Sequence, residues 1–174
     1  MNVVMVGAGV RGRNIARVFA RSGAQLRIFS RTARTFEEAR RSLESEGIVG
    51  VTYVTSIPDA VSDADLVIES VPESVALKLE VLAEAERAAP MGAVIASNTP
   101  SLPLDVLAGA LSRPARFLGL HWFNPAHLIP LVEAVATEAT DHGVVEWSLA
   151  LLTDVGKRPL VVPLIDGFLV NRLQ

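Results

Sequence analysis

A glycine-rich segment near the start of the chain constrains the fold more than any other feature. Residues 7–12 read GAGVRG, directly after the short β-branched run 3–6 and directly before apolar residues at helical spacing. In a strand–turn–helix the three glycines allow a tight turn, close approach of a pyrophosphate to the backbone, and close helix–strand packing. The helix N-terminus adds unpaired N–H groups that suit phosphate. An ordinary turn is the alternative to this predicted dinucleotide site, whose residues are Gly7, Gly9, Val10, Arg11 and Gly12.

Short apolar runs alternate with segments of helical periodicity along most of the chain, which is typical of βαβ units and a parallel sheet. No repeat, low-complexity tract or linker interrupts the pattern. We therefore expect one domain over residues 1–174: an α/β, Rossmann-type doubly wound, mostly parallel sheet with helices on both faces. The expected strands are 3–6, 26–29, 51–54, 66–68, 93–96, 117–121, 129–134 and 160–162, and the expected helices are 14–21, 35–46, 74–89 and 144–152.

The composition excludes several classes of function. A net charge of −3 gives no basic footprint for nucleic acid. The chain has no cysteine and only three histidines, so we expect neither disulfides nor a metal site. No apolar run reaches the roughly 18 to 20 residues of a membrane helix, and no signal peptide is recognisable. We expect a cytoplasmic protein that contacts neither membrane nor nucleic acid.

The segment after the second expected strand bears on the choice of coenzyme. An acidic residue usually stands there and holds the adenosine ribose hydroxyls. This chain has Ser30 instead, followed by Arg31 and Arg34. Because guanidinium groups match phosphate geometry, the segment favours NADP(H), with NAD(H) as the alternative. A solvated arginine-rich loop would explain the same residues.

Five segments, in this order, resemble the 3-hydroxyacyl-CoA dehydrogenase family and its N-terminal NAD(P)-binding domain. They span nearly the whole chain, and the family uses the same spacing of 12 residues between the histidine and the glutamate. The segments are 7–12 (GAGVRG), 65–73 (DLVIESVPE) with Lys78, 97–99 (SNT), 121–125 (HWFNP) with Glu133, and 167–173 (GFLVNRL).

The resemblance implies a dehydrogenase that moves a hydride between the nicotinamide and a 3-hydroxyacyl thioester or related 3-hydroxy acid. His121 would be the general base for the hydroxyl proton, and Glu133 would hold its tautomer and stabilise its charged form. A base with a pKa near neutrality, oriented by a carboxylate, suits alcohol–ketone interconversion. Without the resemblance, the simpler interpretation is that His121 is a core histidine at a strand end and Glu133 a surface acid.

Five further residues take their expected roles from the resemblance alone. Asn124 and Asn171 match asparagines that line the substrate pocket and polarise the substrate oxygen; otherwise they are a turn former and a helix cap. Glu73 and Lys78 match residues near the nicotinamide, with ordinary surface charges as the alternative. Asn98 matches a contact of the nicotinamide ribose, or is a turn residue at a strand end.

The chain departs from the family at three places. Pro100 replaces a serine that hydrogen-bonds substrate in family members, and residues 32–50 leave room for one short helix only. We expect the family's C-terminal helical domain, which supplies the homodimer contact, to be absent or to begin near residue 167. These departures keep open a second interpretation, a non-catalytic NADP(H)-binding or partner-docking module.

Overall fold

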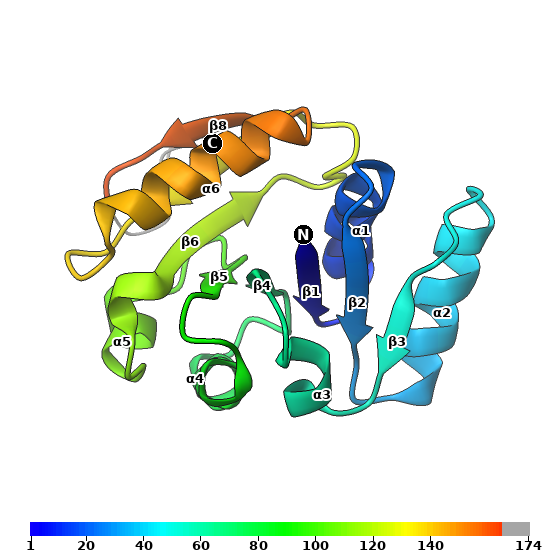
Figure 1. Cartoon of the computed structure of the whole chain (residues 1–174), viewed down its shortest axis with the longest axis horizontal. Helices are drawn as coiled ribbons and strands as arrows, with labels where there is room; N and C mark the ends of the chain where they lie inside the picture. Colours follow the sequence, from blue (N-terminus) through cyan, green and yellow to red (C-terminus); the bar gives the residue numbers. More distant parts are fainter. Residues whose placement is uncertain (165–174) are drawn as a thin grey trace.

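The computed structural model describes residues 1–164, and these form a single eight-stranded sheet with helices on both faces (Figure 1). The strand order is β3-β2-β1-β4-β5-β6-β7-β8. The strands are β1 (Asn2–Val6), β2 (Gln25–Phe29), β3 (Thr52–Val54), β4 (Leu66–Glu69), β5 (Val94–Ser97), β6 (Phe117–Trp122), β7 (Leu131–Val135) and β8 (Arg158–Val161). The α-helices are α1 (Val10–Arg21), α2 (Ala33–Glu44), α3 (Ile57–Val61), α4 (Val75–Ala88), α5 (Leu104–Gly109) and α6 (His142–Asp154).

The sheet is parallel from β3 through β6, and β7 joins it antiparallel to β6. The outermost strand β8 runs parallel to β7. The expected doubly wound, mostly parallel sheet is therefore confirmed. Strand order reverses between β1 and β4, and in open α/β sheets the crevice at such a point binds ligands at the carboxyl ends of the strands.

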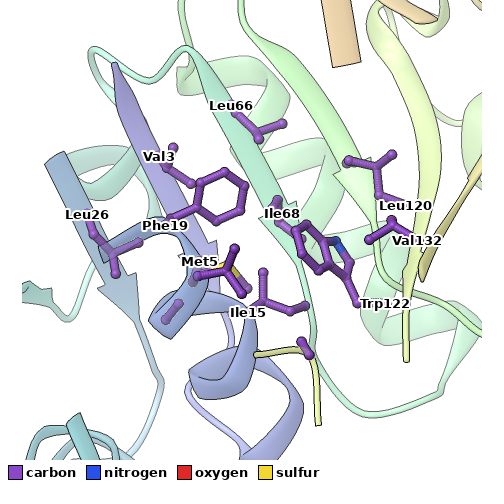
Figure 2. Packing of buried hydrophobic residues seen from close by; sticks show 14 of the residues in the cluster. Val3, Met5, Ile15, Phe19, Leu26, Leu66, Ile68, Leu120, Trp122 and Val132 are labelled. Carbon is purple, nitrogen blue, oxygen red and sulfur yellow. The ribbon is translucent and has the colours of Figure 1, made fainter. Parts of the chain in front are cut away.

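The central strands β4 and β5 are buried on both faces, because an apolar layer covers each face of the sheet. One layer lies between the sheet and α1, α2 and α6, and the other lies under α3, α4 and α5, which gather along one side in Figure 1. In the first layer Ile15 and Phe19 of α1 point at the strands, beside Met5 and Trp122 (Figure 2). The rings of Phe19 and Trp122 meet edge to face, with centroids 5.8 Å apart.

The sequence-based boundaries differ from the structure at specific points. Helix α1 begins at Val10, inside the glycine segment, and not at residue 14. Helices α3 and α5 were not predicted, because five and six residues are too short for a helical period to appear. Within residues 1–164 no helix has both the length and the apolar character that a membrane span requires.

Candidate coenzyme and catalytic site

A cavity of about 590 Å³ opens at the carboxyl ends of β1, β2 and β4, where the strand order reverses. The segments that follow these strands form its walls, and Asn98, which follows β5, completes them. The expected coenzyme residues that line it are Gly7, Gly9, Val10, Arg11, Ser30, Arg31, Glu73 and Asn98.

The three glycines of the loop have different surroundings. A Cβ on Gly7, whose φ is +118°, would lie 2.6 Å from the Ser70 carbonyl oxygen, and a Cβ on Gly12 would lie 1.9 Å from the Gly7 carbonyl oxygen. Among residues 1–164, a Cβ on Gly9 would meet no atom within 4 Å. Gly7 and Gly12 are thus required by the packing of the loop itself, whereas the space at Gly9 is open for a ligand.

In the part of the chain that the structure describes, the N-terminus of α1 faces this space without a protein cap. Gly9 is its N-cap residue and offers no side-chain hydrogen bond, and the first turn carries no acidic residue. The N-termini of α2, α4 and α6, by contrast, are capped by the side chains of Thr32, Ser74 and Asp141. An anion above Gly9 would therefore meet backbone N–H groups and the positive end of the helix dipole, so the residues present fit a coenzyme pyrophosphate.

One end of the cavity, where the adenosine ribose was expected, is formed by the loop after β2. Ser30 Oγ is hydrogen-bonded to the hydroxyl of Thr35 and lies 3.4 Å from the Thr32 amide nitrogen. Arg31 is exposed and lines the cavity. Arg34, which was expected to add a second charge, donates from Nε to Glu38 Oε1 at 2.9 Å. That ion pair offsets the charge of Arg34, so the cationic character of this loop rests on Arg31.

A buried ion pair, which the sequence did not predict, lies beneath the other end of the cavity. Lys78 is 1% exposed, and its Nζ lies 2.7 and 2.9 Å from the two oxygens of Glu69, the last residue of β4. Glu69 also accepts from the Val71 amide and from Ser97 Oγ, each at 2.6 Å. The alternative of Lys78 as a surface charge is wrong. One signal was available, since Glu69 is the single charged residue in an apolar four-residue strand.

Glu73 connects this pair to the cavity. Its Oε2 lies 3.4 Å from Lys78 Nζ, and its Oε1 accepts a hydrogen bond from the Thr99 hydroxyl. The structure thus brings Glu73 and Lys78 together, but only Glu73 is among the residues that line the cavity. Lys78 supports that wall through Glu69 and Glu73.

Asn98 ties the end of β5 to its two neighbouring strands. Its Nδ2 donates to Ser70 Oγ at 3.2 Å, and its Oδ1 accepts from the Trp122 amide at 3.0 Å. Asn98 also borders a shallow hollow that contains Arg11 and Asn124. The large cavity and this hollow therefore share Asn98 and Arg11 and adjoin each other.

His121 and Glu133 form a hydrogen-bonded pair across β6 and β7. The antiparallel register places them directly opposite each other, so their side chains share one face of the sheet. His121 Nδ1 lies 2.8 Å from Glu133 Oε2, and the two residues are 7% and 0% exposed. The imidazole also lies against the ring of Phe123, with centroids 4.5 Å apart. The alternative of Glu133 as a surface acid is wrong.

This pairing defines the tautomer of the imidazole. A carboxylate only accepts hydrogen bonds, so in the neutral imidazole this pairing favours the tautomer with the proton on Nδ1. A histidine so held is oriented as a base, and the carboxylate stabilises the imidazolium that forms when Nε2 takes a proton.

Of the two asparagines expected in the substrate pocket, only Asn124 lies within the described residues. Asn124 follows β6 closely, is exposed, and accepts at Oδ1 a hydrogen bond from the Asn14 side chain of α1. Asn14 was not recognised in the sequence, because the two residues are 110 positions apart and no motif joins them. Asn171 and the segment 167–173 lie outside the described residues.

Comparison with known proteins identifies relatives of this chain. Residues 2–165 match the family described as 3-hydroxyacyl-CoA dehydrogenase, NAD binding domain. The 5-formyl-3-hydroxy-2-methylpyridine 4-carboxylate 5-dehydrogenase of Mesorhizobium japonicum is 33% identical over 99% of this chain, and the chain spans 60% of that relative's length.

Solved structures agree with this match. FadB2 of M. tuberculosis superposes with a TM-score of 0.92 at 38% identity, covering 99% of this chain and 67% of the other. The 3-hydroxybutyryl-CoA dehydrogenase of Escherichia coli superposes with a TM-score of 0.90 at 31% identity, covering 99% and 40%. The similarity therefore extends over nearly all of this chain and over only part of its relatives.

Proposed function

The chain belongs to the 3-hydroxyacyl-CoA dehydrogenase family as its NAD-binding domain, and from this premise we propose that it transfers a hydride between the nicotinamide and a 3-hydroxyacyl thioester or a related 3-hydroxy acid. The observation that carries the proposal is the buried His121–Glu133 pair, with its 2.8 Å hydrogen bond. The ends of β5 and β6 connect the pair to the coenzyme cavity through Asn98, which bonds the Trp122 amide next to His121.

Each residue of the proposed site has one task. His121 Nε2 takes the proton of the substrate hydroxyl, and Glu133 stabilises the resulting imidazolium. The amino group of Asn124 donates to the substrate oxygen. Gly9 and the N-terminus of α1 hold the pyrophosphate, while Glu73 and Asn98 border the nicotinamide end, supported by Lys78. When bound, the nicotinamide supplies the acceptor for the hydride.

Turnover of 3-hydroxybutyryl-CoA, followed by coenzyme reduction, tests this function. His121→Gln should lower kcat by about 10² to 10⁴, the usual worth of a positioned general base, while the coenzyme Kd stays unchanged. His142→Gln is the matched control, because His142 is exposed and lies on α6. Equal kcat values for the unaltered protein and His121→Gln would refute the proposed role of His121.

We also propose that the coenzyme is NADP(H) rather than NAD(H). Ser30 and Arg31 support this, since both line the cavity and neither repels a 2′-phosphate. One charge-assisted hydrogen bond contributes about 1.5 to 3 kcal/mol, or a preference of roughly 10- to 150-fold. Ser30→Asp with Arg31→Ala should invert that preference, as measured by calorimetric titration of both coenzymes at low salt. Equal affinities in the unaltered protein would contradict the proposal.

The remaining predictions concern the whole protein. We propose a cytoplasmic enzyme whose substrate is a free or carrier-bound acyl thioester, and whose homodimer contact lies in a C-terminal helical domain of the kind the family carries. Sedimentation of the native protein from its own cells tests the dimer directly.

A further inference from the structure

A row of polar side chains runs from the end of α2 across α1 to Asn124. Arg17 Nε donates to Glu46 Oε1 and one of its terminal nitrogens donates to Ser42 Oγ, both at 2.6 Å. Its other terminal nitrogen donates to Asn14 Oδ1, and Asn14 Nδ2 donates to Asn124 Oδ1. Arg17 and Asn14 are only 6% and 7% exposed, so their polar atoms depend on these partners.

The chemistry of each member determines the orientation of the next. A guanidinium has donors only, so the atom of Asn14 that faces Arg17 is its oxygen. The opposite edge of the Asn14 amide is then its amino group, which also only donates. The atom of Asn124 that faces Asn14 is therefore its oxygen, and the amino group of Asn124 points away from α1.

Apolar packing fixes helix α1, which carries Asn14, against strand β6, which Asn124 follows. Ile15, the neighbour of Asn14, lies beside Trp122, which precedes Asn124 by two positions (Figure 2). The edge-to-face contact of Phe19 with Trp122 holds the same helix against the same strand. The apolar core thus fixes the separation between the backbone segments that carry Asn14 and Asn124.

We propose that Asn14 and Arg17 are positioning residues, which hold the Asn124 amide with its amino group toward the substrate oxygen. The proposal rests on the function above, in which Asn124 donates to that oxygen. Among residues 1–164 the Asn124 amino group has no hydrogen-bond partner, and Asn124 is exposed and borders the hollow that adjoins the coenzyme cavity. An amide turned the other way would present its carbonyl oxygen and repel a substrate oxygen that gains negative charge.

Asn14→Asp removes the donor that faces Asn124 and keeps the volume of the side chain almost constant. The carboxylate still accepts from Arg17, but it has no donor for Asn124. The Asn124 amide should then turn its amino group toward residue 14 and its oxygen toward the substrate. At saturating coenzyme we expect kcat to fall on the order of 100-fold, as for loss of one preorganised donor, with a smaller change in KM.

A double-mutant cycle separates positioning from a general structural role. In the Asn124→Ala background, Asn14→Asp should cause no further loss of kcat, because the residue through which it acts is gone. If Asn14→Asp lowers kcat equally in both backgrounds, the proposal is overturned. If Asn124→Ala leaves kcat unchanged, the proposed role of Asn124 in the reaction fails instead.

Arg21 offers a matched control for Arg17. Both arginines pair with Glu46, but only Arg17 reaches Asn14. Arg17→Met should lower kcat, since the Asn14 amide is then free to turn, whereas Arg21→Met should leave kcat unchanged. Equal kcat values for these two variants, both folded by thermal denaturation, would contradict the inference.

A readout that does not require turnover completes the test. In ¹⁵N-edited NMR spectra of the unaltered protein, the Asn14 amino protons should exchange slowly with solvent and the Asn124 amino protons rapidly. In Asn14→Asp the Asn124 amino protons should become protected and show contacts to residue 14. If the exchange of the Asn124 amino protons is unchanged in Asn14→Asp, the proposed positioning of Asn124 by Asn14 is overturned, even if no thioester is turned over.

Discussion

Replacing Gly9 with alanine should weaken coenzyme binding while leaving the fold intact. The backbone at Gly9 has φ −65° and ψ −179°, which alanine adopts without strain, and the added Cβ meets no atom of the described residues within 4 Å. The methyl group would instead occupy the space in which a pyrophosphate approaches the N–H groups of α1. Hydrogen bonds of this charge-assisted kind need a nitrogen–oxygen distance of about 2.7 to 2.9 Å, which the methyl group obstructs.

The size of the effect follows from the bonds that are lost. One hydrogen bond to a charged group contributes about 1.5 to 3 kcal/mol, so loss of a single bond raises Kd by roughly 10- to 150-fold. Gly12→Ala behaves differently, because its Cβ would lie 1.9 Å from the Gly7 carbonyl oxygen. Overpacking of that kind costs about 1 to 3 kcal/mol of folding free energy, or more.

Calorimetric titration with NADH and NADPH, together with thermal denaturation, separates these outcomes. Gly109→Ala serves as the control, because Gly109 lies at the end of α5 and no atom of residues 1–164 lies within 4 Å of the added Cβ. We expect Gly9→Ala to lose affinity at an unchanged melting temperature, and Gly12→Ala to lose both. Unchanged coenzyme affinity in Gly9→Ala would refute the placement of the pyrophosphate over the start of α1.

Three further predictions concern the charged residues. Glu133→Gln should lower kcat by about 10² to 10⁴, because the amide no longer enforces the reactive tautomer of His121; coenzyme titration should give an unaltered Kd. The hydrogen bond from Arg17 lowers the pKa of Glu46, so the ionised Glu46 side chain stabilises the fold above pH 4.5, and this stabilisation is lost as the pH falls. In urea denaturation between pH 6 and 3, the free energy of unfolding should therefore fall less steeply with pH in Glu46→Gln than in the unaltered protein. Lys78→Met should cost about 3 to 5 kcal/mol of unfolding free energy, because Glu69 is left as a buried unpaired charge; a loss below 1 kcal/mol would show that this pair is not what supports the wall.

Local sequence was sufficient for the central architecture and for the coenzyme loop. The short apolar runs of β1, β4 and β5 predicted strands of a parallel sheet, since each run is bounded by polar or turn residues, and the structure buries β4 and β5 on both faces. The spacing of the glycines predicted the turn before α1, because backbone sterics act over neighbouring residues. Even there the start of α1 was misplaced, since propensity alone does not reveal that a glycine segment forms a first helical turn.

The resemblance of motifs, and not their spacing, paired His121 with Glu133. An interval of 12 residues places no two side chains together by itself. Here the chain reverses between β6 and β7, and the antiparallel register brings the two residues opposite each other. A register shifted by one residue would turn Glu133 to the other face of the sheet.

The supporting contacts of the site were decided by tertiary structure alone. Glu69 reaches Lys78 because α4 returns over the end of β4, and Asn14 reaches Asn124 across 110 positions because α1 packs on the sheet through Ile15 and Phe19. Such contacts carry no local signature, since each residue alone is an ordinary polar side chain. Burial makes them partners, because a polar atom removed from water costs free energy until another group replaces the lost hydrogen bond.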